Sequence, residues 1–255
     1  MRLICDIGNT TSLFAVFHNG EILLKIRLAT NSLEYEDQFF VFLNTFLQKK
    51  EIEMSDIKGM AISSVVPPID TMLKYFSKKY LKKTPVFVNA FDDVGIKYDK
   101  TDNLHEIGAD RISNVLGASV MHGPDNIVVD FGTAITVDVL KDNSFIGGCI
   151  LPGLETSMKA LFQNTAKLPQ IELFFEDHYL GVNTGDNIRI GIVNGTYYAL
   201  KGIIDECIKV TGPMKVIATG GYSRIFKERK EFFDCIEEDL TLKGTAFFEE
   251  RVRKI

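Results

Sequence analysis

Two stretches of the chain share one order of apolar and polar residues. Residues 3–5 are apolar, Asp-Ile-Gly-Asn-Thr follows at 6–10, and a run rich in β-branched and aromatic residues occupies 13–17. Residues 127–140 repeat this order, with Asp-Phe-Gly-Thr at 130–133 between two apolar runs. Runs of this kind separated by turn residues predict β-hairpins. Each hairpin is therefore expected to carry an acid, a glycine and a hydroxyl in its bend.

The repeat also predicts how the chain divides into domains. Asp6 and Asp130 lie 124 residues apart, about half the length of the 255-residue chain. Asn19-Gly20 follows the first hairpin and Asp142-Asn143 follows the second, and both pairs favour tight turns. We therefore expect two domains of similar build, residues 1–115 and residues 116–255.

Strand and helix patterns alternate in the rest of the chain. The sequence predicts helices at 34–50, 69–81, 106–121 and 188–210, and strands at 59–66, 85–88 and 214–218. Strands that alternate with helices indicate an α/β fold with mixed sheets flanked by helices. No linker is rich in proline and serine, so the two domains are expected to pack closely.

Charge and composition indicate which binding partners the protein is expected to lack. The chain is 45% hydrophobic and 25% charged, as in a globular enzyme, and its formal net charge is −5. A weakly acidic chain has no general attraction to nucleic acid or to an anionic membrane. The basic run at 78–83 is expected to be a solvated helix end or loop. We therefore expect no nucleic-acid partner and no membrane partner.

The N-terminus and the cysteines predict a cytoplasmic protein. Asp6 leaves no room for the apolar stretch of a signal peptide, and no run approaches the roughly 18 apolar residues of a membrane-spanning helix. The four cysteines are scattered and the four histidines share no ligand spacing. This pattern favours reduced, mostly buried thiols over a zinc site or a disulfide framework.

The first bend has the chemistry of a phosphate site. Gly8 lets the backbone approach a phosphate, and Asn9 and Thr10 can donate hydrogen bonds to its oxygens. Asp6, at the strand end, is placed to hold Mg²⁺ directly or through water. An ordinary hairpin could carry the same residues, so this segment alone does not establish a phosphate site. No G-x-x-x-x-G-K-[ST] segment is present, which excludes a P-loop enzyme.

Two later segments repeat this chemistry. Gly132 and Thr133 supply a second bend beside Asp130, and Gly220 belongs to a Thr-Gly-Gly segment that follows a predicted strand. A lone glycine pair is usually a turn. Two such hairpins and a late glycine pair, in this order, resemble the phosphate-1, phosphate-2 and adenosine segments of the actin, Hsp70 and sugar-kinase superfamily. The resemblance implies two ribonuclease-H-like (actin-like ATPase) domains with ATP in the cleft between them.

Asp110 and Arg111 suit phosphate transfer to an alcohol. The carboxylate can orient a hydroxyl and accept its proton as the O–P bond forms, and the guanidinium can stabilise charge on the transferred oxygens. A surface salt bridge with a helix N-cap would look the same in the sequence. The pair therefore indicates catalysis only together with other evidence.

That evidence comes from a resemblance to the type III pantothenate kinase family. It rests on short segments that follow the family order at residues 6–10, 62–67, 108–111, 130–136, 147–153, 165–169, 181–184, 220–221 and 240–244. The segments extend over essentially the whole chain, and their joint order is far more specific than any one of them. The resemblance implies ATP-dependent phosphorylation of pantothenate to 4′-phosphopantothenate, the first step of coenzyme A biosynthesis.

The family resemblance implies roles for individual residues. It makes Asp110 the catalytic base and places Gly108, Arg111, Thr165 and Thr184 on pantothenate. Thr184 is expected to come from the neighbouring subunit of a homodimer.

Further implied roles concern the cations and one tyrosine. A monovalent cation, K⁺ or NH₄⁺, is implied near the second hairpin with Asp130 as its carboxylate, and Asp6 is kept for Mg²⁺. Tyr98 is the candidate for a tyrosine that lines the pantothenate pocket. The segment after it, residues 99–103, is longer than the family pattern, so Tyr98 could equally be structural.

Two other functions fit parts of the sequence. A kinase for another small acceptor would share the fold, but it would not be expected to carry the Gly-x-Asp-Arg segment together with the later threonine segments. A regulatory or accessory protein on the same fold would not need Asp6, Asp110 and Asp130, all of which are present.

Overall fold

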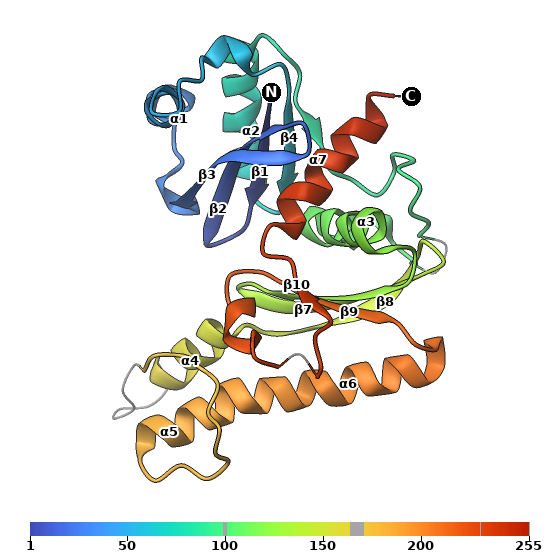
Figure 1. Cartoon of the computed structure of the whole chain (residues 1–255). Helices are drawn as coiled ribbons and strands as arrows, with labels where there is room; N and C mark the ends of the chain where they lie inside the picture. The colour runs from blue at the N-terminus through green and yellow to red at the C-terminus, as the bar shows by residue number, and fades with distance from the viewer. Residues whose placement is uncertain (99–100, 164–170, 230, 255) are drawn as a thin grey trace. The chain divides into compact units, whose positions relative to one another are not determined.

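The computed structural model describes residues 1–98, 101–163, 171–229 and 231–254, which form two compact units (Figure 1). Unit 1 comprises Met1–Val120 together with Leu240–Ile255, and unit 2 comprises Met121–Asp239. The sequence predicted a boundary after residue 115 and a continuous second domain. The structure instead assigns the last 16 residues to the first unit, so unit 1 is built from both ends of the chain.

Unit 1 contains a five-stranded sheet in the order β3-β2-β1-β4-β5. Its strands are β1 (Arg2–Ile7), β2 (Thr11–His18), β3 (Glu21–Ala29), β4 (Met60–Ser64) and β5 (Val86–Phe87). β1 to β3 form an antiparallel meander, while β4 runs parallel to β1 and β5 runs parallel to β4. The predicted first hairpin and the predicted strands at 59–66 and 85–88 are confirmed, and the sheet is mixed as expected.

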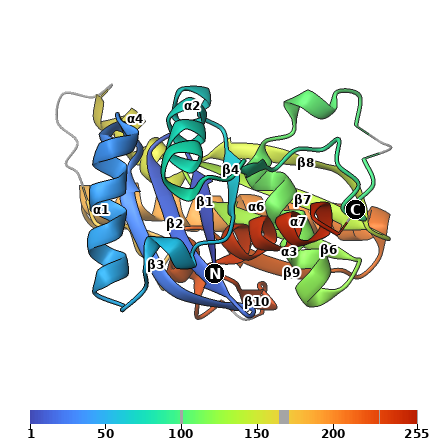
Figure 2. The same ribbon diagram turned by 90° about the horizontal axis from the view of Figure 1, so that it is seen from above.

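The helices of unit 1 cover both faces of this sheet (Figures 1 and 2). They are α1 (Glu36–Gln48), α2 (Pro67–Phe76) with a π-helical extension at Ser77–Leu81, the part of α3 (Ala109–His122) up to Val120, and α7 (Leu240–Val252). Short 3₁₀ turns lie at Thr30–Ser32, Met54–Asp56 and Leu104–Glu106. The predicted helix at 106–121 therefore begins at Ala109, after a separate 3₁₀ turn.

The alternation of side chains along β1 explains these two layers. Leu3, Cys5 and Ile7 belong to the core that α1 and α2 cover. Ile4 points to the other face, where it clusters with Leu242 and Ala246 of α7. Successive side chains of a strand alternate between its faces, so a fully apolar strand requires a helix on each side. The C-terminal helix supplies the second layer, which is why residues 240–252 fold with the N-terminal unit.

α7 also contacts α3 closely. A side chain at Gly244 would overlap with the Ser113 carbonyl, and one at Gly117 would lie 3.0 Å from the Leu240 carbonyl. The buried hydroxyls of Ser113 and Thr245 form a hydrogen bond of 2.9 Å across the contact. Glycine at the crossing lets two helix backbones approach this closely. The helix that carries Asp110 in its first turn is thereby fixed to the sheet through α7.

Unit 2 repeats the sheet of unit 1. Its strands are β6 (Asn126–Phe131), β7 (Ala134–Lys141), β8 (Ser144–Pro152), β9 (Lys215–Thr219) and β10 (Cys235–Ile236), in the order β10-β9-β6-β7-β8. β6 to β8 form an antiparallel meander, and β9 and β10 are parallel additions on the other side of β6. The two sheets have the same connectivity, which confirms the repeat predicted from the sequence.

The helices of unit 2 are α4 (Leu154–Gln163), α5 (Thr184–Arg189) and α6 (Gly195–Thr211), with a π-helical segment at Ile190–Asn194 between the last two and a 3₁₀ turn at Ser223–Phe226. α6 runs along one face of the sheet (Figure 1), where Tyr197, Leu200 and Ile204 are buried against strand residues such as Val137. The predicted helix at 188–210 is thus continuous with α5 through the π-helical segment.

The likeness of the two sheets extends to details of their hydrogen bonding. The register between the second and third strands of each meander shifts once, between Val16 and Phe17 in unit 1 and between Val139 and Leu140 in unit 2. The turns that follow, Asn19-Gly20 and Asp142-Asn143, both have two residues with positive φ. Such pairs match the twist of a two-residue hairpin. Within the described part of the chain, no helix is both long and apolar enough to cross a membrane.

Candidate active site

The first bend is closed by its own backbone. Gly8 N–H donates a hydrogen bond to the Thr11 carbonyl (3.1 Å), and Thr30 N–H donates to the Thr10 carbonyl (3.0 Å). The Thr30 hydroxyl donates to the Gly8 carbonyl at 2.6 Å. Asn9 and Thr10 themselves are exposed. The fold therefore holds this bend in one shape and leaves its two polar side chains at the surface.

Asp6 lies beside a hydroxyl that the sequence analysis left without a role. Asp6 is half-buried at the end of β1 and pairs with Ser63 in the parallel register of β1 and β4. The Ser63 hydroxyl is fully buried and has no hydrogen-bond partner among the described residues. Paired residues of neighbouring strands share one face of the sheet. A carboxylate and a hydroxyl are therefore juxtaposed, and the signal in the sequence was a serine at the end of a buried strand.

Asp110 occupies the first turn of α3. Its Oδ1 accepts a hydrogen bond of 2.8 Å from the Arg111 N–H. Burial raises the pKa of the Asp110 carboxyl above its ordinary value, although the Arg111 N–H and the charge of Arg111 lower it in part. Burial of a carboxylate disfavours its charged form, and the N-terminus of a helix favours a negative charge. Asp110 therefore ionises less readily than a surface aspartate and is a stronger proton acceptor once ionised.

Gly108 makes room for the Asp110 carboxylate. A side chain at residue 108 would overlap with Asp110 Oδ1 and would lie 3.6 Å from Val65 Cγ1. Val65, just past β4, donates its N–H to the Ile7 carbonyl at 3.1 Å. Ile7 directly precedes the first bend. Unit 1 thus brings the first bend, the end of β4 and the start of α3 to the same edge of its sheet; the phosphate and acceptor roles of these residues stay predictions.

The other residues that were predicted to contact pantothenate lie in several parts of the chain. Tyr98 is buried in unit 1, and burial raises the pKa of its hydroxyl; its predicted place in a pantothenate pocket stays a prediction. Arg111 is half-buried and follows Asp110. Thr184 is exposed at the start of α5 in unit 2, where Asn183 caps the helix by accepting a hydrogen bond of 3.0 Å from the Asp186 N–H. Thr165 lies outside the described residues.

In unit 2, Asp130 is enclosed by glycine backbone. Gly220 has φ +87°, and a side chain there would overlap with Asp130 Oδ1 and lie 2.6 Å from Phe131 N. A side chain at Gly132 would lie 3.8 Å from the same oxygen. Both the backbone conformation and the close approach at residue 220 require glycine. The structure thus brings Gly220 against Asp130 and Gly132, which lie about 90 residues earlier in the chain.

The second bend is one residue shorter than the first and has two corresponding backbone hydrogen bonds. Gly132 N–H donates to the Ala134 carbonyl (3.1 Å), and Gly153 N–H donates to the Thr133 carbonyl (3.1 Å). The Thr156 hydroxyl, in the first turn of α4, donates to that same carbonyl at 2.7 Å. Gly153 and Thr156 therefore hold Thr133 in place. The sequence analysis gave Thr156 no role and used Gly153 only as part of a family segment.

The loop after β9 is tied to the same region. Tyr222 N–H donates to the Phe131 carbonyl (3.3 Å), and the Tyr222 hydroxyl donates to Glu155 Oε2 in the first turn of α4 (2.8 Å). These bonds connect the glycine pair at 220–221 with the second bend and with α4. Each unit therefore presents a bend with an aspartate at the end of its central strand.

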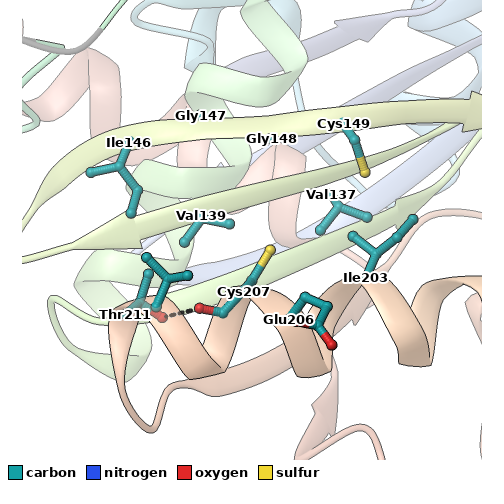
Figure 3. A pocket seen from close by; sticks show the side chains of 11 residues that line it. Val137, Val139, Ile146, Gly147, Gly148, Cys149, Ile203, Glu206, Cys207 and Thr211 are labelled. Atoms are coloured by element: carbon teal, nitrogen blue, oxygen red, sulfur yellow. Dashed lines mark hydrogen bonds between the residues drawn. The ribbon is translucent and has the colours of Figure 1, made fainter.

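A separate pocket lies between the sheet of unit 2 and α6, as Figure 3 shows. It has a volume of about 390 Å³, and its lining is mainly apolar, with Val137, Val139, Cys149, Ile203 and Cys207 among the side chains. Gly147 and Gly148 of β8 also line it. None of the predicted site residues that the structure describes lines this pocket. Its lining includes no lysine or arginine side chain, so the pocket lacks a positive charge for a phosphate.

The chain is similar to known proteins over its full length. The family model for type III pantothenate kinases matches residues 2–206. A type III pantothenate kinase of Kosmotoga olearia is 50% identical over 256 residues, which cover 100% of this chain and 98% of that protein.

Solved structures support the fold alone. A conserved Baf family protein from Campylobacter jejuni superposes with a TM-score of 0.64 at 20% identity, covering 99% of this chain and 100% of that one. MreB 5 of Spiroplasma citri, bound to AMPPNP, superposes with a TM-score of 0.56 at 10% identity, covering 100% and 98%. These neighbours establish the actin-like ATPase fold that the sequence predicted.

Proposed function

The chain belongs to the type III pantothenate kinase family, and on that premise we propose which of its residues transfer the γ-phosphate of ATP to pantothenate. The family activity is ATP-dependent phosphorylation of pantothenate in coenzyme A biosynthesis, and this chain is a kinase of that kind. The observation that carries the assignment of residues is the half-buried Asp110 at the start of α3, held against Gly108 at the edge of the sheet that carries the first bend.

Asp110 is proposed as the general base. Its carboxylate orients the primary hydroxyl of pantothenate and accepts the hydroxyl proton as the new O–P bond forms and the bond from the γ-phosphorus to ADP breaks. The raised pKa of Asp110 supports this role, because a stronger base takes up the proton more readily. Arg111, the next residue, is proposed to contact pantothenate and to balance the developing negative charge.

The two bends are proposed to hold the phosphates of ATP. Gly8, Asn9 and Thr10 provide backbone and side-chain donors in unit 1, and Gly132 and Thr133 provide them in unit 2. Gly220 is proposed to contact the nucleotide through bare backbone, as its positive φ and lack of a side chain allow. Catalysis then consists mainly of positioning and of charge neutralisation.

The residues at the strand ends fit the two cations that the family resemblance implies. Asp6 and the buried Ser63 hydroxyl provide hard oxygen ligands of the kind Mg²⁺ prefers. Asp130 lies in a cradle of backbone that a side chain at Gly220 would fill, and this suits a monovalent cation such as K⁺ or NH₄⁺. When bound, Mg²⁺ supplies positive charge to the phosphates. These assignments are proposals for the two aspartates.

A homodimer is proposed to complete the acceptor site. Thr184 is exposed, and the side chains of Leu180 and Val182 just before it are 86% and 91% exposed. Large apolar side chains exposed side by side suit an interface, which would place Thr184 against pantothenate bound to the partner. The roles of Thr165 and Tyr98, the cytoplasmic location and the absence of a nucleic-acid partner stay predictions.

The test is an assay of ADP release with ATP, Mg²⁺ and pantothenate, in K⁺ and in Na⁺. Asp110→Asn should lower kcat by roughly 10²–10⁴-fold while ATP affinity, measured by calorimetry, stays unchanged. Asp205→Asn is the matched control, because Asp205 is an exposed residue of α6 that pairs only with Lys201 in the described ion pairs. Full activity of Asp110→Asn would exclude Asp110 as the base. Equal activity in Na⁺ and K⁺ would exclude the monovalent-cation role of Asp130.

A further inference from the structure

Three side chains of unit 2 bring an imidazole, a thiol and a carboxylate together. The ligand atoms of His122, Cys235 and Glu237 all lie within 4.8 Å of one another. His122 Nε2 is 3.4 Å from Glu237 Oε1 and 3.9 Å from Cys235 Sγ. Phosphate transfer uses none of these residues. The sequence analysis expected no zinc site, because the cysteines are scattered and the histidines share no ligand spacing; these three residues are 113 and 2 positions apart.

The fold positions the three ligands by its backbone. His122 ends α3, Cys235 begins the edge strand β10, and Glu237 directly follows that strand. Residues two apart on a strand point to the same side, so Cys235 and Glu237 share one face. Glu237 N–H donates to the Ala218 carbonyl of β9 at 2.8 Å, and Cys235 pairs with Ile217. The side chains of His122 and Glu237 are only 11% and 22% exposed.

We propose that His122, Cys235 and Glu237 bind a Zn²⁺ ion, with water as the fourth ligand. Tetrahedral Zn²⁺ has bonds of about 2.0–2.2 Å to nitrogen and oxygen and about 2.3 Å to sulfur. Neighbouring ligand atoms are then about 3.4–3.6 Å apart. The distances of 3.4 and 3.9 Å in this cluster come within a few tenths of an ångström of that geometry.

The donor types select Zn²⁺ over the cations of the phosphate site. Mg²⁺ and Ca²⁺ require oxygen ligands, whereas a thiolate and an imidazole favour zinc and similar ions. Thiolate binding requires loss of the Cys235 thiol proton, which passes to solvent on binding. The site is therefore distinct in chemistry from the Asp6 and Asp130 sites.

Lys215 is expected to weaken Zn²⁺ binding. Its Nζ lies 3.2 Å from His122 Nδ1. Zn²⁺ bound at Nε2 requires the neutral tautomer of His122 that carries its proton on Nδ1, and an ammonium group cannot accept that proton. The exposed Lys215 side chain must therefore turn away when Zn²⁺ binds. Its positive charge also repels the cation, so removal of the charge should strengthen Zn²⁺ binding.

The test titrates the metal-free full chain with Zn²⁺ by calorimetry and records the absorption spectrum with Co²⁺ in its place. We expect one Zn²⁺ per chain and a sulfur-to-Co²⁺ charge-transfer band. Loss of a residue that only supports a ligand costs roughly 10–100-fold in metal affinity, so Cys235→Ser should cost at least about 100-fold. Lys215→Gln should bind Zn²⁺ more tightly than the wild type.

Cys207→Ser is the matched control, because Cys207 is another half-buried thiol of unit 2 and lies on α6. It should keep both the affinity and the Co²⁺ band. Thermal denaturation without metal checks that each variant folds, and Glu237→Gln serves as a second ligand variant. A wild-type chain without the charge-transfer band would overturn the proposal, as would equal Zn²⁺ affinity of the wild type and Cys235→Ser.

Discussion

The Asp110 carboxylate fills the space where a side chain of Gly108 would lie. The relation is steric, and it couples the residue before α3 to the position of the proposed base. Gly108 was expected to contact pantothenate, and the structure adds a positioning role that does not depend on substrate. The two roles make different predictions for substitutions.

Gly108→Ala should therefore impair catalysis by displacing Asp110. We expect kcat to fall by about 10²-fold, because small misplacements of a reacting group are costly. Steady-state kinetics with saturating ATP measures the effect. The control is Gly202→Ala, since Gly202 is an exposed residue of α6 with nothing within 4 Å of an added Cβ, and this variant should retain full activity. A loss confined to the KM for pantothenate would instead indicate that Gly108 acts only through substrate contact.

The pH profile should reveal the raised pKa of Asp110. The base acts in its ionised form, so kcat/KM should rise with pH through the Asp110 pKa, and burial places this rise above the range of an ordinary aspartate. The fall in kcat/KM at low pH should disappear in Asp110→Asn, as measured on the residual activity of this variant. An unchanged fall at low pH in that variant would assign the titration to another group.

Asp110 should also lower stability at neutral pH. The folded state binds the Asp110 proton more tightly than the unfolded state, so the stability of the wild type falls as pH rises from the unfolded pKa, about 3.9, through the raised folded pKa. Asp110→Asn removes the buried charge and should raise the Tm at pH 7. The difference in Tm should vanish at a pH below the unfolded pKa. A lower Tm for the variant at pH 7 would mean that the helix N-terminus outweighs the cost of burial.

Two causes should make Gly220 necessary for stability, its close approach to Asp130 and its backbone conformation, and their contributions should be separable. Gly220→Ala adds both a positive-φ penalty and an overlap with Asp130 Oδ1. Gly212→Ala adds only the first, because Gly212 has φ +82° and nothing within 4 Å of an added Cβ. Each should lose roughly 1–3 kcal/mol of unfolding free energy from backbone strain, and Gly220→Ala should lose clearly more. Denaturant unfolding measures both, and equal losses would contradict the overlap.

The buried Glu249 should anchor the C-terminal helix to unit 1. Its side chain is 0% exposed, with Arg2 Nη1 at 3.2 Å and Arg253 Nε at 2.7 Å. The two arginines are 22% and 45% exposed, so Glu249→Ala leaves no fully buried charge and should cost about 1.5–3 kcal/mol, as for hydrogen bonds to a charged group. Glu250 also pairs with Arg2, but its side chain is 38% exposed. Glu250→Ala should cost about 1 kcal/mol or less, and equal losses in denaturant unfolding would argue against a buried anchor.

Local sequence patterns were sufficient for most of the secondary structure. The two hairpins and most of the helices lie where the apolar periodicity placed them, since a strand or a helix repeats its pattern within a few residues. The repeat at Asp6 and Asp130 even predicted that the two sheets would match. The helix starts were less exact, and α3 begins three residues later than predicted, because terminal turns depend on caps and on neighbouring elements.

Some of the site could also be predicted, because a short bend keeps its residues together. Asp6 with Gly8, and Asp130 with Gly132, are neighbours in the sequence and stay neighbours in the fold. Ser63, Gly153 and Thr156 were given no role of their own. Each reaches its bend through strand pairing or a helix start 20 residues or more away, and no local pattern records such a partner.

The sequence by itself determined the two repeated hairpins, the α/β class and the order of segments that identifies the family, since all three depend on residues close together in the chain or on their order along it. The tertiary structure decided that α7 belongs to unit 1, that Gly220 lies against Asp130, and that His122 meets Cys235 and Glu237. Each of these contacts joins residues about 90 or more positions apart. Contacts of that kind follow from how strands pair and helices cover a sheet, which is settled only when the whole core is packed.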